Sequence, residues 1–71
     1  MKKRIEVKRC YDNISGTIYV TKDNLFLCDV NFNPNNPYFH IISGNEPDGD
    51  PNYPIDESKW NIVIVNEFTD E

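Results

Sequence analysis

Residues 17–32, TIYVTKDNLFLCDVNF, decide the fold of this chain. The first five residues are all β-branched or aromatic, a composition typical of a strand. The polar connection 22–24 has the length of a hairpin loop. The strand expected after it, 25–32, is apolar on both faces for half its length, and a strand of that kind is usually central in a sheet. The stretch therefore predicts an antiparallel hairpin inside a β-sheet.

Alternation of apolar and polar residues extends this sheet in both directions along the chain. Residues 4–11 alternate with a period of two, and the turn-forming residues 12–16 follow them. Further strands are expected over 38–43 and 60–68, with a long acidic loop at 44–59 between them and a single helical turn at 56–59. The sequence predicts one small all-β domain over residues 1–71. We expect about five mostly antiparallel strands in a small twisted sheet or partly open barrel, with at most one short helical turn.

Apolar side chains on both faces of the third and fifth expected strands have to be covered. The two sets are Phe26, Val30, Ile62 and Ile64 on one face, and Leu25, Leu27, Val63 and Val65, the candidate oligomer face, on the other. Burying one such aliphatic side chain stabilises a domain by about 1.5–3 kcal/mol, so an open sheet would forgo much stability. The sheet could curl on itself under the long loop, two copies could stack, or another protein could cover the face. The basic first strand is expected at a sheet edge, where charge discourages aggregation.

Charge divides the chain into a basic start and an acidic end. The net charge is −5; five basic residues stand among residues 1–9, and eight carboxylates stand among residues 44–71. The leading hypothesis is a non-enzymatic interaction domain whose acidic loop and C-terminal part bind a basic protein partner. The expected partner-binding residues are Glu46, Asp48, Asp50, Asp56 and Glu57, with Tyr53 as an aromatic anchor.

An inhibitor of a nucleic-acid-handling protein is one form of this hypothesis, because spaced carboxylates can occupy the Lys and Arg sites that bind a phosphate backbone. In size and charge the chain resembles small acidic inhibitors from phages and other mobile elements, although no motif is shared. The alternative is a small β-domain that binds nucleic acid or a nucleotide through its basic first strand. The residues for that role are Lys2, Lys3, Arg4, Lys8 and Arg9.

Patterns for catalysis, metal binding and cofactor binding are weak. Residues 48–52, DGDPN, begin like a calcium loop, but Tyr53 and Lys59 replace the required glycine and glutamate. The lone His40 has no local partner that would make it a general base. Cys10 and Cys28 do not form a C-x-x-C pair, and no phosphate-binding glycine motif is present. We therefore expect no enzyme activity, no metal and no cofactor.

The compartment is expected to be the cytoplasm. The longest apolar run, residues 62–65, is far short of the roughly 20 residues that span a bilayer. Glu6, Lys8 and Arg9 interrupt the apolar stretch that a signal peptide would need after its basic start. Cysteines in a reducing compartment stay free, so we expect Cys10 and Cys28 to be unpaired.

Overall fold

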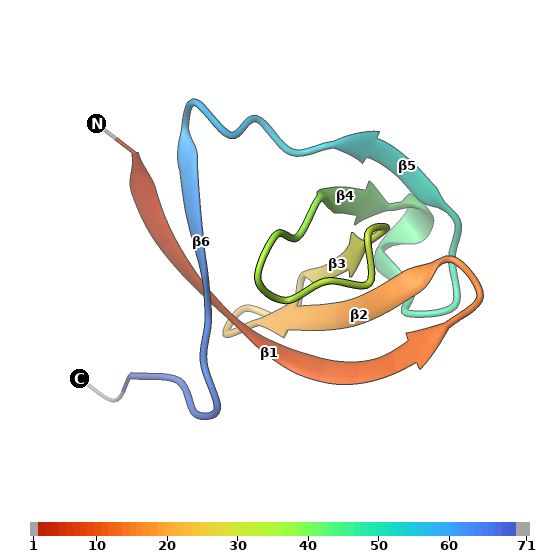
Figure 1. Cartoon of the computed structure of the whole chain (residues 1–71), viewed down its shortest axis with the longest axis horizontal. Helices are drawn as coiled ribbons and strands as arrows, with labels where there is room; N and C mark the ends of the chain where they lie inside the picture. Colours follow the sequence, from red (N-terminus) through yellow and green to blue (C-terminus); the bar gives the residue numbers. More distant parts are fainter. Residues whose placement is uncertain (1, 70–71) are drawn as a thin grey trace.

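The computed structural model describes residues 2–69, in which six strands form one mixed sheet (Figure 1). The strands are β1 (Lys3–Asn13), β2 (Gly16–Thr21), β3 (Phe26–Asp29), β4 (Phe39–Ile42), β5 (Pro51–Pro54) and β6 (Trp60–Ile64). Their order across the sheet is β5-β4-β3-β2-β1-β6. All neighbours are antiparallel except β1 and β6, which run parallel. The expected single all-β sheet is confirmed, and the sheet is not closed into a barrel.

The position of β1 differs from the prediction that the first strand is an edge. The long strand β1 lies between β2 and β6, pairing with β6 over Lys3–Val7 and with β2 over Val7–Asn13. A bulge between Arg9 and Tyr11 interrupts the second ladder. The parallel β1–β6 pair joins the two ends of the chain, and no local sequence signal reports such a pairing. The edges of the sheet are β5 and β6.

Strand β5 lies inside the segment that was predicted to be a loop. Its ends are Pro51 and Pro54, which lack a backbone N–H and therefore suit an edge strand. The predicted helical turn at 56–59 is a single hydrogen-bonded turn, in which the Asp56 carbonyl oxygen accepts from the Lys59 N–H at 3.0 Å and from the Trp60 N–H at 3.2 Å. The single helical segment among residues 2–69 is a 3-10 turn, Ser43–Asn45. The last strand ends at Ile64 rather than near residue 68.

An inner core fills the concave side of the curled sheet. Four side chains from different strands are at most 4% exposed: Val7, Tyr19, Leu27 and Phe39. Half-buried residues of β6 and of the β5–β6 connection pack against them. One layer of sheet thus buries this cluster by curving around it, as the curl of β1 and β2 in Figure 1 illustrates.

The cross-strand register corrects the grouping of the apolar faces. Ile5 pairs with Ile62 and Val7 with Ile64, which places the isoleucines of β6 on the inner face. Leu25 and Leu27 belong to the same inner cluster, and Leu27 is fully buried. Leu25 and Leu27 therefore do not share a face with Val63 and Val65, which are half-buried. The alternation within each strand was correct, but the relation between strands depends on a register that the sequence does not encode locally.

The outer face has its own small core, which the β4–β5 connection covers. Ile18, Cys28 and Ile42 are at most 2% exposed there. The covering segment, residues 43–50, is tied to the sheet by hydrogen bonds: the Phe26 N–H donates to Asn45 Oδ1 at 2.8 Å, and Asn13 Nδ2 donates to the Pro47 carbonyl oxygen at 3.4 Å. The structure therefore matches the first of the three arrangements, a self-curled sheet with part of the long loop over its second face.

A buried carboxylate organises the connection between β3 and β4. Asp29 is fully buried, and its Oδ1 accepts hydrogen bonds from the backbone N–H groups of Asn31 and Tyr38, both at 2.9 Å. Its Oδ2 accepts a third from the Asn33 N–H at 3.0 Å. This carboxylate fixes the shape of residues 30–38, which form one wall of the cavity described below.

No helix within residues 2–69 is both long enough and apolar enough to cross a bilayer.

Candidate functional site

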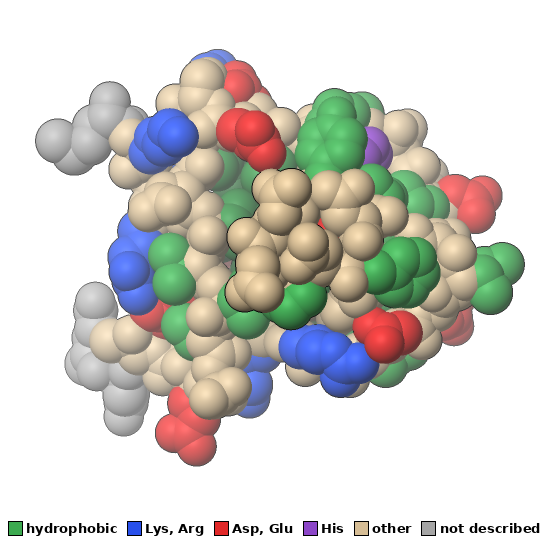
Figure 2. Space-filling view, in the orientation of Figure 1, with side chains coloured by type: hydrophobic (Ala, Val, Ile, Leu, Met, Phe, Trp, Pro, Cys, Tyr) green, Lys and Arg blue, Asp and Glu red, His purple; other side chains and the backbone are tan. Residues whose placement is uncertain are grey.

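The predicted acidic residues divide between the two ends of the β4–β5 hairpin. Glu46, Asp48 and Asp50 precede β5, whereas Asp56 and Glu57 follow it. Ile42 pairs with Pro51 at one end of the hairpin and His40 with Pro54 at the other, so the two acidic groups flank the strand. Figure 2 shows acidic side chains at several separate places on one face of the molecule. Asp70 and Glu71, of the acidic C-terminal part, lie outside the described residues.

Two of these carboxylates have structural partners. Asp48 Oδ1 accepts a hydrogen bond of 2.7 Å from the Tyr11 hydroxyl, and this bond raises the pKa of Tyr11. Asp56 Oδ1 accepts hydrogen bonds from the hydroxyl and the backbone N–H of Ser58, which lower the pKa of Asp56. The other three side chains make no hydrogen bond or ion pair with any described residue: Glu46, Asp50 and Glu57.

Exposed aromatic side chains accompany the acidic ends of the hairpin. Tyr53 is 57% exposed on β5, between the two acidic groups and opposite Ile41. Tyr38, just before β4, is 42% exposed, and its ring meets that of His40 edge to face at a centroid distance of 4.6 Å. The edge strand β5 thus exposes a tyrosine, and carboxylates without partners among the described residues lie before and after the strand.

The predicted basic residues do not form a continuous strip. Alternation along β1 places Lys3 and Arg9 on one face and Arg4 and Lys8 on the other, while Lys2 precedes the strand. Both arginines are engaged by carboxylates. Arg4 contacts Glu6 at 3.0 Å and Arg9 contacts Asp12 at 3.1 Å. The Lys8 ammonium lies 5.6 Å from the centre of the Phe68 ring.

Glu6 anchors the C-terminal segment to β1. Its Oε1 accepts a hydrogen bond of 2.7 Å from the Thr69 N–H, and its Oε2 accepts one from the Thr69 hydroxyl. The Lys22 ammonium donates to the Thr69 carbonyl oxygen at 3.2 Å. The two Thr69 hydrogen bonds, followed by that from Arg4, lower the pKa of Glu6 from 4.5 to about 2.

A pH titration should detect this anchor. Because the pKa of Glu6 is lower in the folded chain, its stabilising effect is complete above pH 4.5 and is lost as the pH falls toward about 2. The carboxyl carbon of Glu6 should titrate near 2 in an NMR experiment, and Thr69→Ala, which removes the hydroxyl donor, should move that midpoint upward. A midpoint near 4.5 in the unaltered protein would show that Thr69 does not hold the carboxylate.

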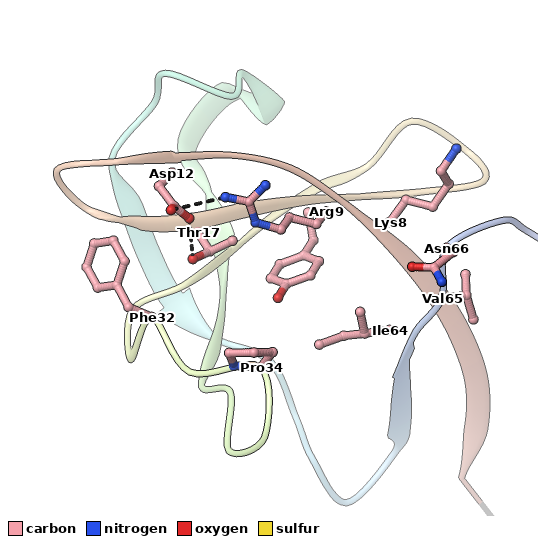
Figure 3. Close-up of a pocket in the computed structure, with 10 residues that line it drawn as sticks. Lys8, Arg9, Asp12, Thr17, Phe32, Pro34, Ile64, Val65 and Asn66 are labelled. Carbon is pink, nitrogen blue, oxygen red and sulfur yellow. Dashed lines mark hydrogen bonds and ion pairs between the residues drawn. The ribbon is translucent and has the colours of Figure 1, made fainter.

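A cavity of about 340 Å³ opens where the concave side of the sheet reaches the surface (Figure 3). Four segments that are distant in the sequence line it: Lys8, Arg9 and Asp12 of β1, Thr17 and Tyr19 of β2, Phe32 and Pro34 of the β3–β4 connection, and Ile64, Val65 and Asn66 at the end of β6. The open ends of curled β-sheets are frequent ligand sites, and this volume lies at the small end of the usual range.

Polar side chains in the cavity form a short chain of interactions. Arg9 Nη2 lies 3.1 Å from Asp12 Oδ2, and the Thr17 hydroxyl donates to Asp12 Oδ1 at 2.7 Å. The Thr17 bond, then the charge of Arg9, hold the pKa of Asp12 below its ordinary value. Tyr19 contributes to the wall from the inner core, where burial and the charge of Asp29 raise its pKa.

Other candidates from the sequence do not assemble into sites. Within residues 2–69, no three His, Cys, Asp or Glu side chains are grouped so that they could hold a metal ion. The DGDPN segment has no calcium-loop geometry, since Asp48 is bound to Tyr11 and Pro51 begins β5. Cys10 is exposed, Cys28 is buried, and both thiols are free.

The cavity residues Thr17, Tyr19 and Asn66 were missed, as was the structural role of Asp29. Asp29 carried a usable signal, because an Asp before Asn31, Asn33 and Pro34 favours side-chain hydrogen bonds to the backbone of a turn. Tyr19 had no such signal, since an aromatic residue in a strand is ordinarily part of a core.

Neither a protein-family model, nor a curated protein, nor a solved structure matches this chain.

Proposed function

We propose that this chain is a non-enzymatic interaction domain that binds a basic surface of a partner protein through the β4–β5 hairpin. The observation that supports this function is the exposed Tyr53 on an edge strand whose two ends carry carboxylates without partners. Tyrosine supplies a large contact area at a low entropic cost, and the free carboxylates steer a basic partner toward it.

The backbone of β5 supports recognition by side chains rather than by strand addition. A peptide that extends a sheet needs N–H donors along the edge, and prolines occupy both ends of β5. Binding would then depend on Tyr53 and on the flanking charges. An inhibitor of a nucleic-acid-handling protein remains a specific form of this proposal. The free thiols of Cys10 and Cys28 fit a reducing, cytoplasmic compartment.

Nucleic-acid binding through β1 has weaker support. Arg4 and Arg9 are each held by a carboxylate, and the basic residues point to both faces of the sheet. Each of these carboxylates offsets part of the positive charge of its arginine, which weakens the attraction of β1 for a phosphate backbone.

Neutralising the free carboxylates tests the proposal. A photo-crosslinking amino acid at position 53, introduced into the full chain in its native cells, should capture a partner with a basic surface. The triple variant Glu46→Gln, Asp50→Asn, Glu57→Gln should then lower the affinity for that partner by about tenfold, because each exposed ion pair contributes about 0.2–1 kcal/mol.

Controls at other exposed positions separate this surface from general charge effects. The double variant Asp23→Asn, Glu67→Gln removes exposed carboxylates elsewhere and should leave the affinity unchanged. A crosslinker at Ile14, which is fully exposed at the β1–β2 turn, should not capture the partner. Equal capture from positions 14 and 53, or equal losses in the two sets of variants, would refute binding by the hairpin.

A further inference from the structure

The cavity lies between β1, β2, the β3–β4 connection and the end of β6, and it is separate from the acidic hairpin. Several hydrogen-bond donors that line it have no partner among the described residues. Its most informative group is the Tyr19 hydroxyl. The residue is 1% exposed and lines the cavity, yet this hydroxyl has no hydrogen-bond partner within residues 2–69. Every fully buried side-chain polar atom of the described residues has a partner, so the unpaired hydroxyl is one that the cavity reaches.

Arg9 supplies a positive charge to the cavity. Only its Nη2 contacts Asp12, and the remaining N–H donors of the guanidinium have no partner among the described residues. Asp12 in turn is held by Thr17, so the guanidinium is positioned by a carboxylate that is itself fixed. A guanidinium that is oriented in this way retains donors for a second, planar anion.

The other residues that line the cavity include both polar and apolar side chains. The Asn66 side chain adds an amide without a described partner, and Figure 3 shows the Lys8 ammonium directed away from the other labelled side chains. Phe32, Pro34 and Ile64 are apolar, and Phe32 is half exposed. The cavity thus combines side-chain donors with the apolar surfaces of Phe32, Pro34 and Ile64.

We propose that this cavity binds a small organic anion, whose carboxylate or phosphate lies among Arg9, Tyr19 and Asn66 while its apolar body packs against Phe32 and Pro34. The free guanidinium donors of Arg9, the Tyr19 hydroxyl and the Asn66 amide can all donate to one anionic group, a combination that a cation could not use. The Tyr19 hydroxyl is open to the cavity and has no partner among residues 2–69, so it is free to donate to an oxygen of the ligand. The proposal does not depend on the function of the acidic hairpin.

An NMR titration of the full chain, labelled with ¹⁵N, tests this site with three probes of similar shape. Benzoate or phenyl phosphate should produce saturable chemical-shift changes at the Asn66 amide, the Arg9 Nε–H and the Phe32 backbone. The probe with the higher affinity shows whether the cavity prefers a carboxylate or a phosphate. Benzamide has the same ring without the charge and should bind at least about tenfold more weakly, since hydrogen bonds to charged groups contribute about 1.5–3 kcal/mol.

Two pairs of variants assign the binding to these residues. Tyr19→Phe should weaken anion binding by about tenfold or more and leave thermal stability nearly unchanged, because the hydroxyl has no partner to lose. Tyr38→Phe, which removes a hydroxyl outside the cavity, should have no effect on binding. Arg9→Gln should abolish binding, whereas Arg4→Gln should preserve it.

The absence of saturable shifts with both anions up to about 10 mM would overturn the proposal, since that limit corresponds to a binding free energy of only about −3 kcal/mol. Equal affinity for benzamide would also overturn it. If Arg9→Gln does not fold, the comparison of Tyr19→Phe with Tyr38→Phe still decides the matter, because equal effects of these two variants would place the ligand elsewhere.

Discussion

Replacing Asp29 with alanine is expected to lower the free energy of unfolding by about 3 kcal/mol or more. The substitution leaves the N–H groups of Asn31, Asn33 and Tyr38 without their acceptor, and each hydrogen bond to a charged group contributes about 1.5–3 kcal/mol. Water can reach part of the loop and recover some of that loss. A domain of 71 residues has a total stability of about 4–10 kcal/mol, so chemical denaturation should show a largely unfolded or marginal protein.

Asp29→Asn provides a graded comparison. It keeps one carbonyl oxygen but replaces the other acceptor with an amide donor, so its loss should be smaller than that of alanine. Asp23→Ala, at an exposed position in the β2–β3 turn, should change stability by no more than about 0.5 kcal/mol. Hydrogen exchange in Asp29→Asn should accelerate at Asn31, Asn33 and Tyr38 before it accelerates in β2. Uniform acceleration over the whole chain would mean that Asp29 acts through the core rather than through the loop.

The hairpin of β2 and β3 was predictable because its signals are local, although β3 ends at Asp29, three residues before the predicted end at residue 32. The β-branched run that forms β2 and the short polar turn after it specify strands regardless of what packs against them. The same reasoning found β1 and β4 with boundary errors of about one or two residues, which is usual for element ends. Apolar residues on both faces also indicated that both faces of the sheet are buried. In the structure the curled sheet buries one face, and the β4–β5 connection covers part of the other.

The parallel pair of β1 and β6 was beyond the sequence argument. The two strands are separated in the sequence by all the other strands, and a pairing between such distant segments produces no local sequence pattern. Strand β5 was missed for a different reason. Two prolines argued against a strand, and their missing N–H groups are tolerated only because β5 is an edge with β4 on one side.

The sequence identified the charged residues but not their grouping. Glu46 and Glu57 were expected in one acidic loop, and β5 separates them. Lys8 and Arg9 were expected on one basic strand, and the pleat of β1 sends them to opposite faces. Arg9 meets Tyr19 because the two residues are paired directly across the β1–β2 ladder, and the end of β6 completes the cavity, a combination that only the three-dimensional arrangement reveals.

Replacing Gly16 with alanine is expected to destabilise the domain by about 2–3 kcal/mol. Gly16 begins β2 and lies against β3, where an added Cβ would overlap the Asp29 carbonyl oxygen and approach Cys28 Sγ to 2.7 Å. The first obstacle is backbone, so β2 and β3 would have to separate at the position that orients the Asp29 side chain. Overpacking of this kind typically costs about 1–3 kcal/mol.

Gly44→Ala is the matched control, because it makes the same chemical change without the steric conflict. Nothing lies within 4 Å of a Cβ at Gly44, but its φ of +69° is unfavourable for alanine, which predicts a loss of about 1 kcal/mol. Thermal unfolding should therefore rank Gly16→Ala well below Gly44→Ala in stability. Since the displaced backbone carries Asp29, Gly16→Ala should also accelerate hydrogen exchange at Asn31 and Asn33, an effect that Gly44→Ala should lack. Equal stability of the two variants would mean that β2 and β3 are not packed as closely at Gly16 as the structure has them.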